Sequence, residues 1–124
     1  MLSIAQTRNV GVGQVVVREG EPGNEMFAVA RGRLLITRGG HPLAEVRAGG
    51  YFGELVLFDT APRSATVTTV EDTQLVAIDR EGLIALMRSN VELGNKLLWN
   101  VGRILAGRLR QTSATLARER SAAG

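Results

Sequence analysis

Apolar and polar residues alternate along residues 7–79 in short runs, with turn signals at intervals of roughly six to twelve residues. The 15 glycines in so short a chain suit many tight turns better than a helical bundle. This pattern predicts a small antiparallel β-roll, similar to a jelly-roll barrel. The predicted strands are Thr7–Val10, Gln14–Arg18, Glu25–Ala30, Arg33–Arg38, Leu43–Arg47, Ala65–Val70 and Thr73–Asp79.

After Asp79 the spacing of apolar residues lengthens from two toward 3.6, the period of an α-helix. Asp79 is a suitable N-cap for a short helix that ends near Arg88, and Ser89-Asn90 predicts a break that caps a second helix. One apolar stripe follows the second helix at steps of three or four residues. Its members are Leu93, Leu97, Val101, Leu105, Leu109, Thr112 and Leu116, with Leu98 and Ile104 beside them.

A helix this long cannot bury its stripe against a small roll alone, so we predict a homodimer through paired C-terminal helices. The chain then divides into a β-roll core at residues 1–90, a long C-terminal helix at 91–120 and a short tail at 121–124. Together these elements make a mainly β protein of the α+β class, with its helices at the C-terminal end.

The length of 124 residues corresponds to one domain. The sequence contains no apolar run of the roughly twenty residues that span a bilayer, and its first residues lack the pattern of a secretion signal. We therefore expect a cytoplasmic protein without a membrane span. The absence of cysteine excludes disulfides, thiol nucleophiles and cysteine-based metal sites.

Positive charge gathers near the C-terminal end of the chain. Six basic residues against one acid give +5 from position 96 onward, which leaves −2 for the rest of a total of +3. The basic residues are Lys96, Arg103, Arg108, Arg110, Arg118 and Arg120, and the acid is Glu119. No aromatic residues are interleaved for base stacking, so a solvated helix face is favoured and direct DNA binding is not expected.

The densest chemical signal is the stretch at residues 51–67, where apolar positions surround one acid, Glu54, and one arginine, Arg63. A charge among apolar residues needs a partner or a ligand. A short helix starting near Glu54 would direct free N–H groups at an anion, and Arg63 would add a planar fork of donors. Three glycines allow close backbone approach: Gly49, Gly50 and Gly53. The stretch therefore predicts a loop that holds a phosphate.

Two halves of this stretch resemble a known motif. Phe52-Gly53-Glu54-Leu55, followed after a short spacer by Pro62-Arg63-Ser64-Ala65-Thr66-Val67, is similar to the phosphate-binding cassette of cyclic nucleotide-binding domains. Bacterial catabolite activator proteins, protein kinase A regulatory subunits and nucleotide-gated channels share this module. The resemblance implies a non-enzymatic sensor that binds cAMP, possibly cGMP, and signals to a downstream protein of unknown identity.

The resemblance also assigns roles to individual residues. Glu54 should accept the ribose 2′-hydroxyl, Arg63 should bind the equatorial phosphate oxygens and Ser64 should add a hydroxyl donor. Backbone N–H groups complete the anion site, from Gly53, Leu55 and Ala65. A cyclic phosphate monoanion suits one arginine with backbone donors, so no metal or cofactor is required.

The purine base would be held by the C-terminal helix. Leu109-Arg110-Gln111-Thr112-Ser113 is similar to the stretch in catabolite activators where a threonine and the following serine meet the adenine, the serine from the opposite subunit. Ligand binding would then be coupled to helix geometry. Two hydroxyl residues in a helix can also be solvated or bond back to the preceding turn. By the same resemblance, a serine at position 64, where relatives often have a threonine that serves guanine, favours cAMP over cGMP.

Other readings of the same residues stay open. An ion pair between Glu54 and Arg63 would close the loop without a ligand and leave a nucleotide-independent, dimeric interaction module. A cupin-type metalloenzyme is excluded, because the single histidine, His41, cannot build its metal site. Two further stretches are predicted to act only as turns of the roll, Glu19–Asn24 and Arg31–Leu34. Trp99 is predicted to pack rather than to stack on a base.

Overall fold

The computed structural model describes residues 5–57 and 62–123, without the side chains of positions 104, 108, 109 and 111–123. The chain divides into two compact units, Met1–Leu86 and Met87–Gly124, and each is described by itself. None of the helices in the described part combines the length and the apolar character needed to cross a membrane.

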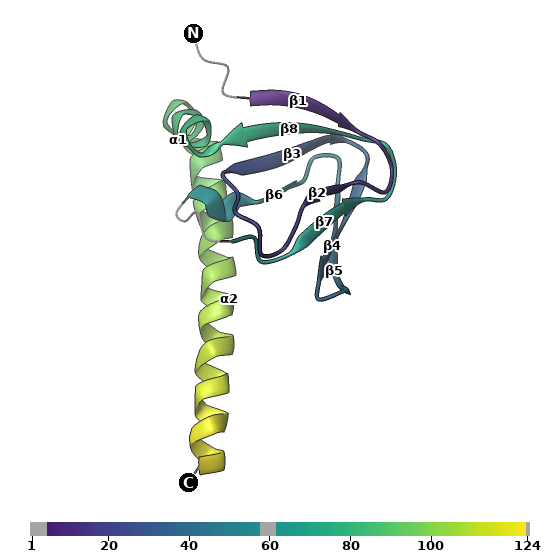
Figure 1. Ribbon diagram of the computed structural model, residues 1–124. Coiled ribbons are helices and arrows are strands. Elements are labelled where there is room, and N and C mark those ends of the chain that lie inside the picture. Colours follow the sequence, from purple (N-terminus) through teal and green to yellow (C-terminus); the bar gives the residue numbers. More distant parts are fainter. Residues whose placement is uncertain (1–4, 58–61, 124) are drawn as a thin grey trace. The chain divides into compact units, whose positions relative to one another are not determined.

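The first unit is an open roll of two four-stranded antiparallel sheets (Figure 1). The first sheet has the order β1 (Ala5–Val10), β8 (Thr73–Asp79), β3 (Glu25–Arg31) and β6 (Tyr51–Phe52). The second has the order β2 (Val15–Val17), β7 (Thr66–Thr69), β4 (Arg33–Arg38) and β5 (His41–Arg47). The predicted antiparallel roll with C-terminal helices is thus confirmed, although its sheets do not close into a barrel.

The sequence did not predict strand β6, which directly precedes Gly53. β6 has two residues, and it pairs with β3 through Phe27 opposite Phe52 and Ala28 opposite Tyr51. A strand this short shows no period of its own, so alternation cannot reveal it. Its place in the sheet brings the start of the 51–67 stretch against the middle of β3.

The core of the roll forms where the inward positions of both sheets meet. Leu34 on β4 and Leu75 on β8 are completely buried, and every second residue of β7 and β8 is buried in the manner of strands with one core face. The rings of Phe27 and Phe52 stack with centroids 5.1 Å apart. The full cluster is Phe27, Val29, Leu34, Val46, Phe52, Val67, Leu75 and Ala77.

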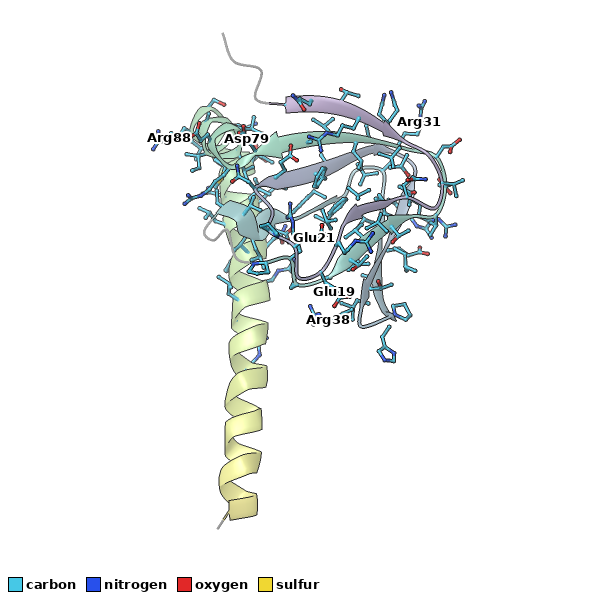
Figure 2. The ribbon with its side chains drawn as sticks, in the orientation of Figure 1. Glu19, Glu21, Arg31, Arg38, Asp79 and Arg88 are labelled. Atoms are coloured by element: carbon cyan, nitrogen blue, oxygen red, sulfur yellow. The ribbon has the colours of Figure 1, made fainter. Side chains whose placement is uncertain are left out.

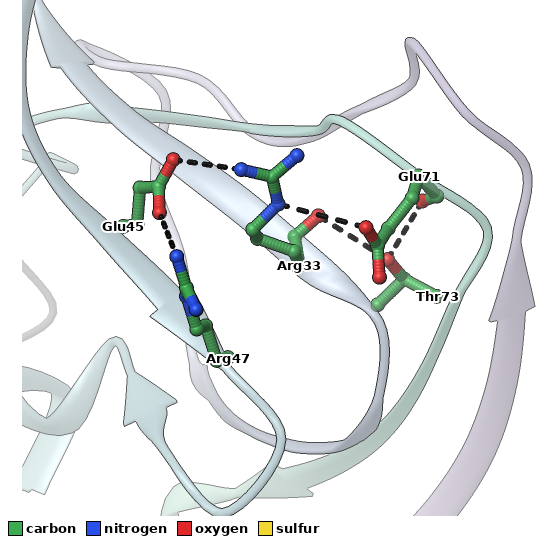
Figure 3. Close-up of polar contacts among 5 residues, drawn as sticks. All are labelled: Arg33, Glu45, Arg47, Glu71 and Thr73. Atoms are coloured by element: carbon green, nitrogen blue, oxygen red, sulfur yellow. Dashed lines mark hydrogen bonds and ion pairs between the residues drawn. The ribbon is translucent and has the colours of Figure 1, made fainter.

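One surface of the roll carries a network of charged side chains (Figure 3). Arg33 Nη1 lies 3.1 Å from Glu45 Oε1, and Arg33 Nε lies 3.5 Å from Glu71 Oε2. Arg47 extends the network to Glu45 at 3.1 Å, while the Thr73 hydroxyl donates to the Glu71 carbonyl oxygen at 2.9 Å. The charged side chains of this network are more than a third exposed, so solvent screening leaves each ion pair a small contribution to stability.

Both helices begin at the residues that the sequence predicted as caps. Helix α1 (Arg80–Ser89) follows β8, and Asp79 Oδ1 accepts the Gly82 N–H at 2.7 Å. In the second unit, helix α2 (Val91–Ala123) starts after Asn90, whose Oδ1 accepts the Leu93 N–H at 3.0 Å. A side-chain oxygen thus satisfies an otherwise unpaired N–H of each first turn.

The Asp79 cap gives a stability prediction. Replacing Asp79, at the junction of β8 and α1 (Figure 2), by alanine removes the acceptor for Gly82 N–H. We expect Asp79→Ala to lower the free energy of unfolding by about 1 kcal/mol, whereas Asp79→Asn, which retains an acceptor oxygen, should lose only a small part of this. Urea unfolding of the three proteins measures the difference. Equal losses in both variants would contradict the capping role.

Candidate functional site

The main chain of Arg63 is held by the loop that follows β2. The Arg63 N–H donates to the Glu21 carbonyl oxygen at 2.8 Å, and the Gly20 N–H donates to the Arg63 carbonyl oxygen at 2.8 Å. Gly20 adopts a φ of 84°, which glycine accepts without strain and which turns the loop toward Arg63. These two hydrogen bonds fix the position of the Arg63 main chain independently of the contacts of its side chain.

The Arg63 guanidinium lies in a narrow space left by two glycines. Its Nη2 donates to the main-chain carbonyl oxygen of Glu25, at the start of β3, with a distance of 2.7 Å. A Cβ atom at Gly23 would overlap the guanidinium, and one at Gly53 would lie 2.9 Å from Nη1. Only residues without a side chain therefore fit on these two sides of the group.

Burial and charge act on Arg63 in opposite directions. Burial lowers the pKa of Arg63, because it removes water from the guanidinium, and the nearby negative charge of Glu25 acts to raise it. The Glu25 carboxylate in turn accepts two hydrogen bonds from Arg8, at 3.2 and 2.8 Å. Arg63 thus remains a partly desolvated cation, a condition that an anionic ligand would relieve.

A cavity with a volume of about 440 Å³ borders Arg63. The volume falls in the range of roughly 300–1,000 Å³ that is usual for small-molecule sites. Three arginines and three acids line it together with apolar side chains, so it offers both charged groups and an apolar surface. The lining residues are Arg8, Val16, Val17, Arg18, Glu21, Pro22, Gly23, Asn24, Glu25, Phe27, Arg63 and Asp79.

The short helix predicted near Glu54 is present as the single 3₁₀ turn η1 (Glu54–Leu57). Gly53 precedes it with a φ of 83° and accepts the Val56 N–H at 3.3 Å through its carbonyl oxygen. Val56 and Leu57 are buried and anchor the turn in the roll. A single turn has a small dipole, so Arg63 would supply most of the attraction for an anion.

The structure places the predicted site residues in separate parts of the chain. Gly53 lies beside the Arg63 guanidinium, and Glu54 and Leu55 follow Gly53 in η1. Ser64 and Ala65 continue the main chain from Arg63 toward β7. Thr112 and Ser113 belong to α2 in the second unit, and their side chains lie outside the described residues. Their contact with a base therefore stays a prediction.

Sequence reasoning missed the residues outside the 51–67 stretch that position Arg63. The stretch Glu19–Asn24 was predicted to act only as a turn, yet its main chain holds Arg63 and Gly23 faces the guanidinium. Glu25 contributes a backbone oxygen, and its carboxylate is paired with Arg8. The sequence signal that points to this role is Gly23, because a glycine in a turn also marks a place where another part of the chain comes close.

The chain belongs to the cyclic nucleotide-binding domain family, whose model matches residues 7–90. It is 34% identical over 110 residues to the CRP-like cAMP-activated global transcriptional regulator of Mycobacterium tuberculosis, covering 85% of this chain and 47% of that protein. It is 32% identical over 101 residues to the cAMP-dependent protein kinase regulatory subunit of Dictyostelium discoideum, covering 69% of this chain and 31% of that protein.

Solved structures give the same result for the fold. The Thermus thermophilus catabolite activator protein matches with a TM-score of 0.71 and 35% identity, covering 91% of this chain and 54% of that chain. The sensor domain of the transcriptional regulator DNR from Pseudomonas aeruginosa matches with a TM-score of 0.67 and 25% identity. The chain spans about half or less of the length of the curated relatives described above.

The space around Arg63 gives a second prediction. Gly53→Ala would introduce strain at a φ of 83° and place a Cβ atom 3.0 Å from the Glu25 carbonyl oxygen. Gly49→Ala is the matched control, because Gly49 has a φ of 90° and nothing within 4 Å of an added Cβ. We expect about 1–2 kcal/mol of lost stability from φ alone in both variants, and about 1–3 kcal/mol more in Gly53→Ala from overpacking.

Urea unfolding of the wild-type protein and both variants measures this difference in the free energy of unfolding, and equal m-values in the three proteins make the values comparable. The same loss in both variants would show that the roll tolerates a Cβ atom at Gly53, contrary to the close packing of Arg63, Gly53 and Glu25.

Proposed function

We propose that this domain binds a cyclic nucleotide, cAMP in preference to cGMP, and that Arg63 binds the cyclic phosphate. The observation that carries the proposal is the Arg63 guanidinium, partly desolvated and held at a cavity by a neutral carbonyl oxygen rather than by a carboxylate. This acceptor carries no net charge and so does not itself neutralise the positive charge of Arg63. A guanidinium has five N–H donors, and the bond to Glu25 uses one of them.

Family membership supports a cyclic nucleotide as the anion. The matched relatives include a cAMP-activated regulator and a cAMP-dependent kinase regulatory subunit. Within the proposed site, Glu54 accepts the ribose 2′-hydroxyl, Ser64 donates its hydroxyl, and the N–H groups of Gly53, Leu55 and Ala65 bind phosphate oxygens. These donors and acceptors suit a cyclic phosphate and ribose without a metal or a cofactor.

The response to the ligand is proposed to run through α2. In this proposal Thr112 contacts the base and Ser113 contacts it from the opposite subunit, so that the ligand stabilises one arrangement of paired helices. Among the described side chains of α2, four large apolar ones are exposed in the single chain: Val91 at 69%, Leu98 at 45%, Trp99 at 77% and Leu105 at 45%. Trp99 is predicted to pack rather than to stack on a base, and in the proposed dimer a second copy of α2 would cover it.

The alternative, a nucleotide-independent interaction module, relied on an ion pair between Glu54 and Arg63. Among the described residues, the side-chain hydrogen bond of Arg63 goes to Glu25, and Glu25 is the acid that acts on its pKa. This bond fixes Arg63 through a main-chain oxygen and does not require the ion pair. Failure of the domain to bind any cyclic nucleotide would restore it.

Titration calorimetry with cAMP and cGMP tests the binding proposal. We expect saturable binding with cAMP the tighter ligand, and we expect Arg63→Leu to weaken binding by about 2–5 kcal/mol, the scale for removing one member of a buried charged hydrogen-bonded pair. Arg47→Leu is the control, since its side chain is 72% exposed and pairs with Glu45. Wild-type affinity in Arg63→Leu would refute the role of Arg63.

Light scattering after size exclusion tests the dimer. We expect the wild-type protein to have twice the mass of one chain, and Leu98→Glu/Leu105→Glu to be monomeric because a charge replaces each apolar contact. Leu43→Glu is the control, as Leu43 is 51% exposed on β5. A monomeric wild-type protein, or a double variant that remains dimeric, would rule out pairing through this face of α2.

A further inference from the structure

The tip of the β4–β5 hairpin lies beside the segment that carries Arg63. The hairpin turns through Gly39 and Gly40, whose φ values of 57° and 81° fit a two-residue type I′ turn. Strand β4 also pairs with β7, with Thr37 opposite Thr66. The hairpin tip therefore extends beyond Thr66, the first residue of β7, and reaches the residues between Arg63 and Thr66.

Arg38 makes a specific contact with this segment. Its Nε donates to the main-chain carbonyl oxygen of Ser64, at 2.9 Å. This oxygen belongs to the Ser64–Ala65 peptide group, so the bond restrains the main chain one residue after Arg63, the proposed phosphate-binding residue. The Arg38 side chain is exposed, which makes its contribution to the core small.

Glu19 holds the hairpin tip in place from the other side. Both of its carboxylate oxygens accept the Gly39 N–H, at 3.1 and 3.3 Å, and Oε1 also accepts the Thr66 hydroxyl at 3.3 Å. The hydrogen bond of a β-turn is donated by its fourth residue, so the N–H of Gly39 remains available for Glu19. Figure 2 shows Glu19 and Arg38 close together at the hairpin.

We propose that Arg38 is a positioning residue for Arg63, with Glu19 fixing the hairpin tip that presents Arg38. Two segments then hold the stretch from Arg63 to Thr66. The loop at residues 18–21 bonds to the Arg63 main chain and, through Glu19, to the Thr66 hydroxyl, and Arg38 of the hairpin bonds to the Ser64 carbonyl oxygen. Arg38 acts on ligand affinity by restricting the orientations of the Ser64–Ala65 peptide, and with it the main chain that carries Arg63. The effect on affinity rests on the proposed function, whereas the restraint itself does not.

Two substitutions at one position separate the hydrogen bond from the charge. Arg38→Gln removes the charge but keeps an N–H donor at the same point of the side chain as Nε, whereas Arg38→Met has similar length and no donor. Arg47→Met is the control, because Arg47 is an exposed arginine of the neighbouring strand that bonds to Glu45. Urea unfolding should give the same midpoint for Arg38→Met and Arg47→Met.

The first measurement is amide hydrogen exchange in the ligand-free protein. In Arg38→Met we expect the Arg63 amide to exchange about 2- to 10-fold faster, the equivalent of losing one solvent-exposed hydrogen bond. In Arg38→Gln and Arg47→Met its rate should match that of the wild-type protein. An unchanged rate in Arg38→Met, an equal rise in Arg38→Gln, or a rise at all roll amides would overturn the positioning role.

The second measurement is the dissociation constant for cAMP. Arg38→Met should weaken binding by about 2- to 10-fold, with Arg38→Gln and Arg47→Met close to the wild-type value. Faster exchange at Arg63 with unchanged affinity would overturn the link between the restraint and binding. If the wild-type protein binds no cyclic nucleotide, the proposed function fails, and the exchange rates still decide whether Arg38 positions Arg63.

Discussion

The hydrogen bond from Arg63 to the Glu25 carbonyl oxygen, 2.7 Å long, is the contact on which the site depends. It joins the 51–67 stretch to the start of β3, and it forms only because Gly23 and Gly53 leave room for the guanidinium. The acceptor is a main-chain dipole and carries no net charge. The arginine is therefore fixed in direction by an acceptor that does not neutralise its charge.

The roll supports this contact from several directions. The stacked rings of Phe27 and Phe52 anchor β6 against β3, which places Gly53 next to the first residues of β3. The loop after β2 holds the main chain of Arg63, and the β4–β5 hairpin reaches the carbonyl oxygen of Ser64. Core packing thus sets the general position of the arginine, and hydrogen bonds from the surrounding loops set its local orientation.

Local signals explain which elements the sequence predicts well. Strands Arg33–Arg38 and Thr73–Asp79 have the predicted bounds, because each combines alternation with a clear boundary at both ends. Turns flank the first strand, and the second ends at the cap of α1. Asp79 and Asn90 cap their helices through contacts three residues away, which a local pattern can report. Strand β6 has two residues and leaves no pattern, and the exposure of Trp99 depends on which surfaces surround its helix.

The amino-acid sequence by itself determined the roll, the caps of both helices and the motif around Arg63, since these follow from spacing and residue type. Only the tertiary structure decided which groups hold Arg63. Its partners are the backbone oxygens of Glu21 and Glu25, and the neighbouring peptide is bound by Arg38, which is 26 residues away from Ser64 in the chain. Every residue has a backbone carbonyl, so the identity of these partners leaves no mark on the sequence.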